Sequence, residues 1–160
     1  MRVVVRLDVT DETSARELFL REARYMMGRS EEEVPTTILA LPNLLTADFM
    51  AWHFFTEELA EDLEEGGALE HIGDNVLIAA FHPHFEFGGL EEKDDVLNFE
   101  KRAPLPMINL LRTEAIDRGL DEGITADSIH DHNEEVLRAE GLDAVRLAFM
   151  AVLHRQRPNS

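Results

Sequence analysis

The sequence predicts an α/β fold in which a small sheet of three or four strands is packed with helices as a two- or three-layer sandwich. Segments with the apolar–polar alternation of a strand are followed along the chain by segments whose apolar residues recur every three or four positions, as in a helix. The length of 160 residues, of which 44% are hydrophobic, suits one core rather than two. Because no repeat or linker interrupts the pattern, we expect a single domain over residues 1–160 with a frayed tail at 155–160.

The N-terminal part predicts a strand followed by a helix. In residues 2–9 the apolar side chains share one face and the charged ones fall largely on the other, as in an edge strand with one wetted face. Thr10 or Asp11 can cap the helix that follows, and Gly28 can end it. The apolar face of this strand carries Val3, Val5, Leu7 and Val9.

The middle of the chain predicts two more strands around a second helix. Residues 35–42 are β-branched and apolar between two prolines, which indicates a strand. Thr46 can cap the next helix, which Gly66-Gly67 would end. Residues 75–81 form the most apolar run, and such a run predicts a central strand that is covered on both faces.

The last third of the chain predicts three helices. Pro106 suits the first turn of a helix whose buried stripe would be Ile108, Leu111 and Ala115, with Gly119 at its end. Thr125 can cap a helix that reaches about Arg138, and another follows Gly141. Five helices and three strands are thus expected in the order strand, helix, strand, helix, strand and then helices.

Composition excludes several classes of partner and chemistry. The formal net charge of −18 would repel nucleic acids and anionic membranes, so we expect neither as a partner. No apolar run approaches the ~20 residues that span a bilayer, and charged residues follow Met1 too closely for a signal peptide. We therefore expect a cytoplasmic protein. The absence of cysteine excludes disulfides, thiolate metal sites and cysteine nucleophiles.

The common enzyme signatures are also missing. The sequence contains neither a dinucleotide-binding Gly-x-Gly-x-x-Gly nor a phosphate-binding loop that ends in Gly-Lys-Ser/Thr. It also lacks His-Glu-x-x-His and Gly-x-Ser-x-Gly, the motifs of zinc proteases and serine hydrolases. The sequence therefore identifies no cofactor and no reaction, and it indicates no oligomeric state.

The polar segment after the apolar run is the candidate functional site. His82 stands where the strand at 75–81 ends, and ligands collect at the carboxyl ends of strands in open α/β sheets. Arg102, together with the positive end of the helix expected from Pro106, can attract an anion. His82 can transfer a proton near neutral pH. This hypothesis requires the side chains of His82 and Arg102 to face a shared hollow.

The resulting prediction is an enzyme or binder of a small anionic metabolite at residues 81–112. The candidate catalytic residues are His82, Asp94 and Asp95, where an aspartate would orient His82 or Arg102. The candidate ligand-binding residues are Asn98, Arg102 and Arg112.

The same residues also fit a non-catalytic structural or protein-interaction module. In that alternative, His82 caps the strand end, the aspartates satisfy turn donors, and the arginines pair with these acids, so that the network pins the loop to the sheet. His82-x-His84 with Glu86 and an aspartate has the composition of a zinc, iron or manganese site. Pro83 disturbs that spacing, and His130-x-His132 on a helix would diverge, so no metal ligand is assigned.

One string of motifs is similar to a known family. It comprises Phe81-His82-Pro83, Phe87-x-Gly89, Asp94-Asp95-Val96-x-Asn98-Phe99, Arg102-Ala103-Pro104-x-Pro106 and Leu110-Leu111-Arg112. Upstream Thr36-Thr37-Ile38-Leu39 with Pro42, and downstream Ile129 with Asn133, extend it over nearly the whole chain. The chain resembles the bacterial family catalogued as domain of unknown function 1415. The resemblance supports the fold and the site, and it implies no reaction.

The chain departs from that family's pattern at several places. The family usually opens with a helix and a Cys-Pro-Phe-Ala motif, so this chain is expected to be truncated or divergent at its start. His84, Phe85, Asn109 and Thr113 stand where the family has Asp, Tyr, His and Glu. If those positions are catalytic in the family, the activity is lost or altered here.

Overall fold

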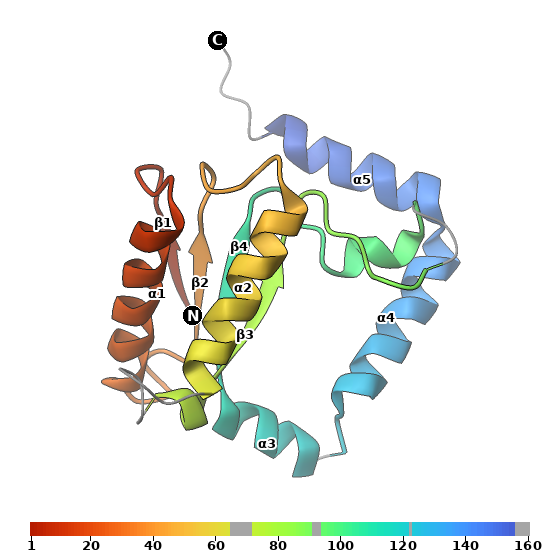
Figure 1. The fold of residues 1–160 in the computed structure, drawn as a ribbon. Helices are drawn as coiled ribbons and strands as arrows, with labels where there is room; N and C mark the ends of the chain where they lie inside the picture. The colour runs from red at the N-terminus through yellow and green to blue at the C-terminus, as the bar shows by residue number, and fades with distance from the viewer. Residues whose placement is uncertain (65–71, 91–93, 122, 156–160) are drawn as a thin grey trace.

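The computed structural model describes residues 1–64, 72–90, 94–121 and 123–155, and within them the chain has an α/β fold (Figure 1). Four strands form one mixed sheet in the order β1-β2-β4-β3. The strands are β1 Arg2–Val5, β2 Thr36–Ala40, β3 Val76–Phe81 and β4 Met107–Arg112. β1 runs parallel to β2, whereas β4 is antiparallel to both of its neighbours.

Five α-helices and two short 3₁₀ helices accompany the sheet in the described residues. The α-helices are α1 Glu12–Met27, α2 Phe49–Glu64, α3 Thr113–Asp121, α4 Ala126–Glu140 and α5 Leu142–Arg155. The 3₁₀ helices are η1 Gly73–Asn75 and η2 Val96–Glu100. Helices α1 and α2 lie over the sheet, and α3, α4 and α5 form a frame beside it (Figure 1). None of the helices in the described part has the length and apolarity needed to cross a membrane.

The core lies between the sheet and helices α1 and α2. Phe19 of α1, Trp52 and Phe55 of α2, and Leu39 and Ile108 of the sheet are each at most 1% exposed. Each such side chain contributes about 1.5–3 kcal/mol through its removal from water. Helices α3 and α4 contain no fully buried residue among those described. The apolar packing that stabilises the sheet therefore comes mainly from α1 and α2.

The opposite face of the sheet is not covered by α1 or α2. The register places its side chains in rows, because Val3 lies beside Ile38, Ile38 beside Asn109, and Asn109 beside Ala79. We call this surface the open face. It comprises Val3, Val5, Thr36, Ile38, Ala40, Leu77, Ala79, Phe81, Met107, Asn109 and Leu111.

The first strand is an edge strand as predicted, but it is shorter and faces the other way. It ends at Val5, and Val3 and Val5 are more than half exposed on the open face. The core side instead holds Arg2, whose guanidinium Nε lies 2.8 Å from Oε2 of the buried Glu22. An alternating pattern shows that the two faces differ, but it does not show which face the helices cover.

The prediction that residues 75–81 form a central strand is wrong. β3 is the other edge strand, paired only with β4, and Leu77 is 46% exposed. The apolar run arises because one face packs against the core and the open face is also uncharged. The central position is taken by β4, which joins β2 to β3.

The helix predicted from Pro106 is also wrong, because residues 107–112 form β4. Ile108 and Leu110 alternate into the core while Leu111 faces the open side, so the period is two. The helix starts at Thr113 and continues past Gly119 to Asp121. Isoleucine and leucine suit both structures, and the pairing with two neighbouring strands decides between them.

The predicted helix caps are largely confirmed. Asp11 accepts the N–H of Ser14 at 2.9 Å, and Gly28 ends α1. Thr125 caps α4 with a reciprocal bond to Ser128. Thr46 is not the cap of α2, because Asp48 accepts the N–H of Ala51 there. The predicted stop at Gly66-Gly67 and most of the tail at 155–160 lie outside the described residues.

Candidate functional site

His82 follows β3 directly and is fully buried. Its Nε2 lies 3.1 Å from the carbonyl oxygen of Leu45, and its Nδ1 accepts the N–H of His84 at 3.1 Å. Because Nδ1 is the acceptor, the proton lies on Nε2, which donates to Leu45. The rings of Phe49 and Trp52 lie 5.6 and 6.0 Å from the imidazole.

This environment keeps the imidazole of His82 neutral. Burial lowers the pKa of His82 below its ordinary value, and the bond to Leu45 offsets the shift only in part. Leu45 itself has a φ of 51°, a left-handed backbone that leucine rarely adopts. The histidine thus holds a strained turn after β2 against the loop after β3. Acid–base catalysis by His82 stays a prediction.

The segment from 82 to 106 is closed by bonds between side chains and its own backbone. Asn98, only 1% exposed, accepts the N–H of Phe87 at 2.8 Å. Asp95 caps η2 by accepting the N–H of Leu97 at 2.8 Å. The N–H of His82 donates to the carbonyl of Lys101 at 3.1 Å, which ties the start of the segment to its end.

Arg102 binds the same segment from its far end. Its Nε donates to the carbonyl of Phe85 at 3.0 Å, and its guanidinium lies 4.6 Å from the centre of the Phe99 ring. Burial lowers the pKa of Arg102, while nearby Asp94 and Glu86 act in the opposite direction. The group remains cationic near neutral pH.

The two aspartates of this segment point toward the C-terminal helices. Asp94 is exposed and lies 3.9 Å from Arg146 of α5, and Asp95 lies 3.6 Å from Arg138 of α4. Both distances fit weak, solvent-screened ion pairs. The pairs fasten the segment to the helical frame, and the catalytic roles of Asp94 and Asp95 stay predictions.

Arg112 is not brought together with the other candidates. It is 6% exposed and lies at the opposite end of the sheet, where β4 ends. Its Nε and Nη2 donate to the carbonyls of Val34, Met26 and Arg29 at 3.1, 2.6 and 2.8 Å. These contacts cap the end of α1 and leave Arg112 engaged within the protein.

An apolar pocket of about 680 Å³ lies beside the segment, against α3 and α4. Neither His82 nor Arg102 is among its lining residues, so the shared hollow expected for this pair is not this pocket. The lining comprises Phe87, Glu100, Lys101, Leu111, Ala115, Ile116, Gly119, Leu120, Ile124, Ala126, Ile129 and His130. Four of these residues belong to the segment 81–112 that the sequence singled out.

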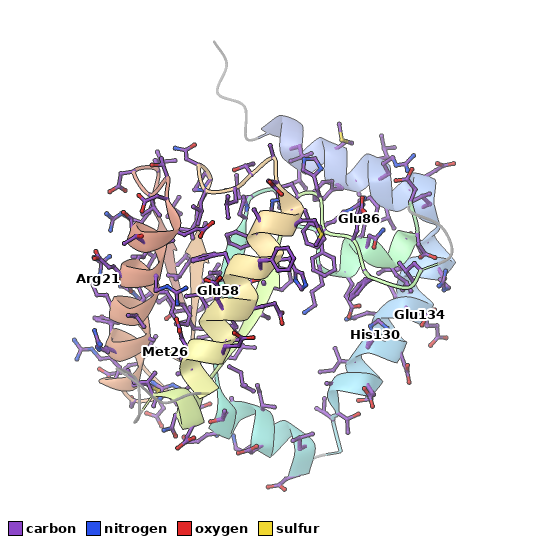
Figure 2. All side chains as sticks on the ribbon, in the orientation of Figure 1. Arg21, Met26, Glu58, Glu86, His130 and Glu134 are labelled. Atoms are coloured by element: carbon purple, nitrogen blue, oxygen red, sulfur yellow. The ribbon has the colours of Figure 1, made fainter. Side chains whose placement is uncertain are left out.

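The polar part of the pocket wall consists of Glu100, Lys101 and His130, and Asn133 supports Glu100 from outside the wall. Glu100 of η2 lies with Oε2 2.7 Å from Nδ1 of His130 and accepts the amide of Asn133 at 3.0 Å. His130 lies on the side of α4 that faces the segment (Figure 2). Lys101 adds an ammonium group whose nitrogen lies 5.3 Å from the centre of the Phe81 ring.

Glu100, Lys101 and His130 are not among the site residues predicted from the sequence. His130 and Asn133 are three residues apart and therefore share one helical face, which is the signal that could have indicated a common partner. The pairing considered was His130 with His132, which lie on different faces. Within the ranges that the structure describes, no three histidine, aspartate or glutamate side chains gather closely enough to hold a metal ion.

The fold and these contacts define an α/β protein with a mixed four-stranded sheet, a one-sided core and a side-chain-braced segment next to an apolar pocket. The family described as Protein of unknown function (DUF1415) matches residues 1–147, and the chain belongs to this family. No curated protein and no solved structure matches the chain significantly.

Proposed function

We propose that the protein binds a small molecule with an apolar body and one anionic group in the pocket beside residues 87–101. The pocket carries this proposal, because its volume of about 680 Å³ falls within the range of about 300–1,000 Å³ typical of small-molecule sites. Such sites combine apolar walls with a few polar groups that fix the orientation of the ligand.

The apolar body is inferred from the walls. Four parts of the chain supply them: the segment with Phe87, β4 with Leu111, and the helices α3 and α4. Ile124 and Ile129 are 48% and 50% exposed without a ligand, so a ligand that covers them removes apolar surface from water. Each methylene buried in this way contributes about 0.8 kcal/mol.

The anionic group is inferred from the charges at the wall. The carboxylate of Glu100 is only 11% exposed and already accepts two bonds, from His130 and Asn133. No carboxylate in the described residues lies within 4.0 Å of the Lys101 ammonium. In a chain with 33 acidic residues, this cation therefore favours an anionic ligand over a cationic one.

In our proposal, His82, Asn98 and Arg102, which the sequence singled out, hold the backbone of the segment that forms one wall of this pocket. Asn98 fixes the backbone of Phe87, which is a wall residue, and Arg102 fixes the backbone of Phe85. His82 anchors the start of the same segment. We infer positioning roles for these three residues, while direct ligand binding by Asn98, Arg102 or Arg112 stays a prediction.

A second candidate function is a non-catalytic structural or protein-interaction module. It is favoured by the same bonds, because His82, Asn98 and Arg102 donate to or accept from backbone groups. In this candidate the pocket is a packing gap beside the frame of α3, α4 and α5, and it takes no ligand.

Binding of matched amphiphiles distinguishes the two candidates. Decanoate and phenylpropionate should raise the thermal midpoint of the wild-type protein, and the alcohols of the same carbon skeletons should do so less. A ligand at 100 times its Kd would stabilise the protein by about 2.7 kcal/mol. Lys101→Met should weaken carboxylate binding about tenfold and leave alcohol binding unchanged, because a tenfold loss corresponds to about 1.4 kcal/mol.

Arg146→Met is the matched control, because Arg146 is a partly exposed cation outside the pocket lining. It should bind carboxylates as the wild type does. An equal loss in both variants would show general charge attraction instead of a site at Lys101. If no member of the panel binds, the ligand proposal fails and the second candidate stands.

A further inference from the structure

We propose that His130 is a catalytic base and that the protein hydrolyses esters of apolar carboxylic acids in the pocket beside residues 87–101. The inference rests on the proposed function, because the acid released by such a reaction has the apolar body and the anionic group inferred for the ligand. Two observations carry it. A nearly buried carboxylate holds one ring nitrogen of His130, and the same histidine lines the pocket.

The carboxylate of Glu100 orients the imidazole of His130. Its Oε2 lies 2.7 Å from Nδ1 of His130, and its Oε1 accepts the amide of Asn133 at 3.0 Å. Because an ionised carboxylate only accepts hydrogen bonds, the proton of the neutral imidazole lies on Nδ1, and Nε2 carries the lone pair. No other polar group in the described part of the chain binds this imidazole. Nε2 is therefore the nitrogen that can take a proton from a reactant.

Packing also restricts the ring of His130. The ring of Phe87 lies edge-on to it, with the two ring centres 6.0 Å apart and the planes at 68°. Asn98 in turn fixes the backbone of Phe87, whose N–H it accepts at 2.8 Å. A catalytic group needs such support, because proton transfer tolerates only a narrow range of orientations. Glu100 and Phe87 are thus positioning residues for His130.

Water is the nucleophile that the pocket favours. Among the described residues that line it, none carries the hydroxyl or thiol group of a serine, threonine, tyrosine or cysteine. The side chain of His130 is 44% exposed, so water reaches its imidazole. A base that activates water for attack on an acyl carbon needs no covalent intermediate on the protein.

The reaction consumes one ester and one water. Nε2 of His130 takes a proton from the water while the water oxygen adds to the acyl carbon, and negative charge develops on the carbonyl oxygen. Lys101, the cation of the pocket wall, favours that charge. The tetrahedral intermediate then collapses, the bond between the acyl carbon and the leaving oxygen breaks, and the imidazolium returns its proton to that oxygen. The products are an alcohol and a carboxylic acid, which loses its proton near neutral pH.

Hydrolysis of para-nitrophenyl phenylpropionate by the full chain tests this inference, after subtraction of the rate in buffer alone. The kcat/KM of the wild type should exceed that for para-nitrophenyl acetate at least about tenfold, because acetate lacks the apolar body that the pocket walls would bury. His130→Gln should lower kcat by about 100-fold or more, which is the contribution typical of a positioned base. It should still bind phenylpropionate in a thermal-shift assay, which shows that the pocket is folded.

Glu100→Gln tests the positioning role. The amide of glutamine can donate to Nδ1, which would leave the proton of the imidazole on Nε2 and remove the base. We expect kcat to fall at least about tenfold, while KM and the binding of phenylpropionate stay unchanged. A residue that only stabilised the fold would not separate kcat from KM in this way.

His132→Gln is the matched control, because His132 is exposed on the same helix and lies outside the lining of this pocket. It should keep the wild-type kcat. Equal rates for the wild type and His130→Gln would overturn the proposal and reduce the contact of His130 with Glu100 to a bond that joins α4 to η2. Binding of phenylpropionate without ester hydrolysis would refute the catalytic inference and leave the proposed function intact. If the wild type neither binds phenylpropionate nor hydrolyses its ester, both proposals fail for this ligand class.

Discussion

Arg112 provides the sharpest test of how the sheet and the first helix are joined. Its guanidinium donates to carbonyl groups at and just beyond the end of α1, where the helix dipole favours a cation, and the Met26 carbonyl also accepts the N–H of Arg29 at 3.1 Å. No carboxylate in the described residues lies within 4.0 Å of it. Three backbone carbonyls are its oxygen partners.

The perturbation is Arg112→Met, which keeps most of the side-chain length and removes the donors. Each bond from a charged donor contributes about 1.5–3 kcal/mol, and each buried carbonyl left unsatisfied costs about 1–3 kcal/mol. The Met26 carbonyl keeps the N–H of Arg29 as a donor, so the loss rests mainly on the bonds to Val34 and Arg29, and we expect Arg112→Met to destabilise the fold by about 2–5 kcal/mol. For a chain of this length the thermal midpoint should fall by about 10 °C.

Equilibrium urea unfolding, followed by circular dichroism, measures the change in the free energy of unfolding. Arg112→Lys should fall between the wild type and Arg112→Met, because an ammonium can reach only some of the three carbonyls. Arg138→Ala is the control, since the Arg138 side chain is 48% exposed and its ion pairs should contribute less than about 1 kcal/mol. A loss below 1 kcal/mol in Arg112→Met would refute the argument that these bonds stabilise the fold.

Three further predictions concern other buried or close contacts. The free energy of unfolding should fall as the pH drops below about 6.5, because burial lowers the pKa of His82 and the unfolded chain therefore binds a proton there more readily than the folded chain. Thermal unfolding of His82→Gln should show a flatter pH profile over that window. Asn98→Ala should lower the free energy of unfolding in a urea titration by about 1–3 kcal/mol, because it leaves the N–H of Phe87 without its acceptor; an unchanged free energy would contradict that role. Gly73→Ala should destabilise by more than 2 kcal/mol in a thermal scan, because its Cβ would collide with the backbone carbonyl of Leu63; equal midpoints for wild type and variant would contradict that geometry.

Local signals in the sequence predicted the fold class and most helix ends. Asp11 and Thr125 cap helices because the bonds they make lie within three residues, so a short window contains the whole interaction. The strand at 107–112 could not be predicted in this way. Its identity depends on pairing with β2 and β3, which lie far away in the sequence.

The candidate site shows the same division between local and distant information. The prolines, glycines and charged residues of the polar segment predicted an irregular loop after an apolar strand, and the structure has that loop between β3 and β4. Its role as a functional site stays a prediction. The partners of its side chains were not predictable, since the contact of His82 with Leu45 and that of Glu100 with His130 join residues 37 and 30 positions apart. Burial of His82 likewise depends on α2, whose aromatic residues surround it.

The pairing of Phe81 with Met107 has a consequence for how this protein can change. Residues 82–106 leave the sheet and return to it at neighbouring positions, so the sheet closes on either side of them without their help. Loop length adds only slowly to the entropy of closure, so the sheet itself sets no narrow limit on the length of this excursion. Its conformation is determined instead by the bonds of His82, Asn98 and Arg102, three residues that lie within it and within the motifs that resemble the family.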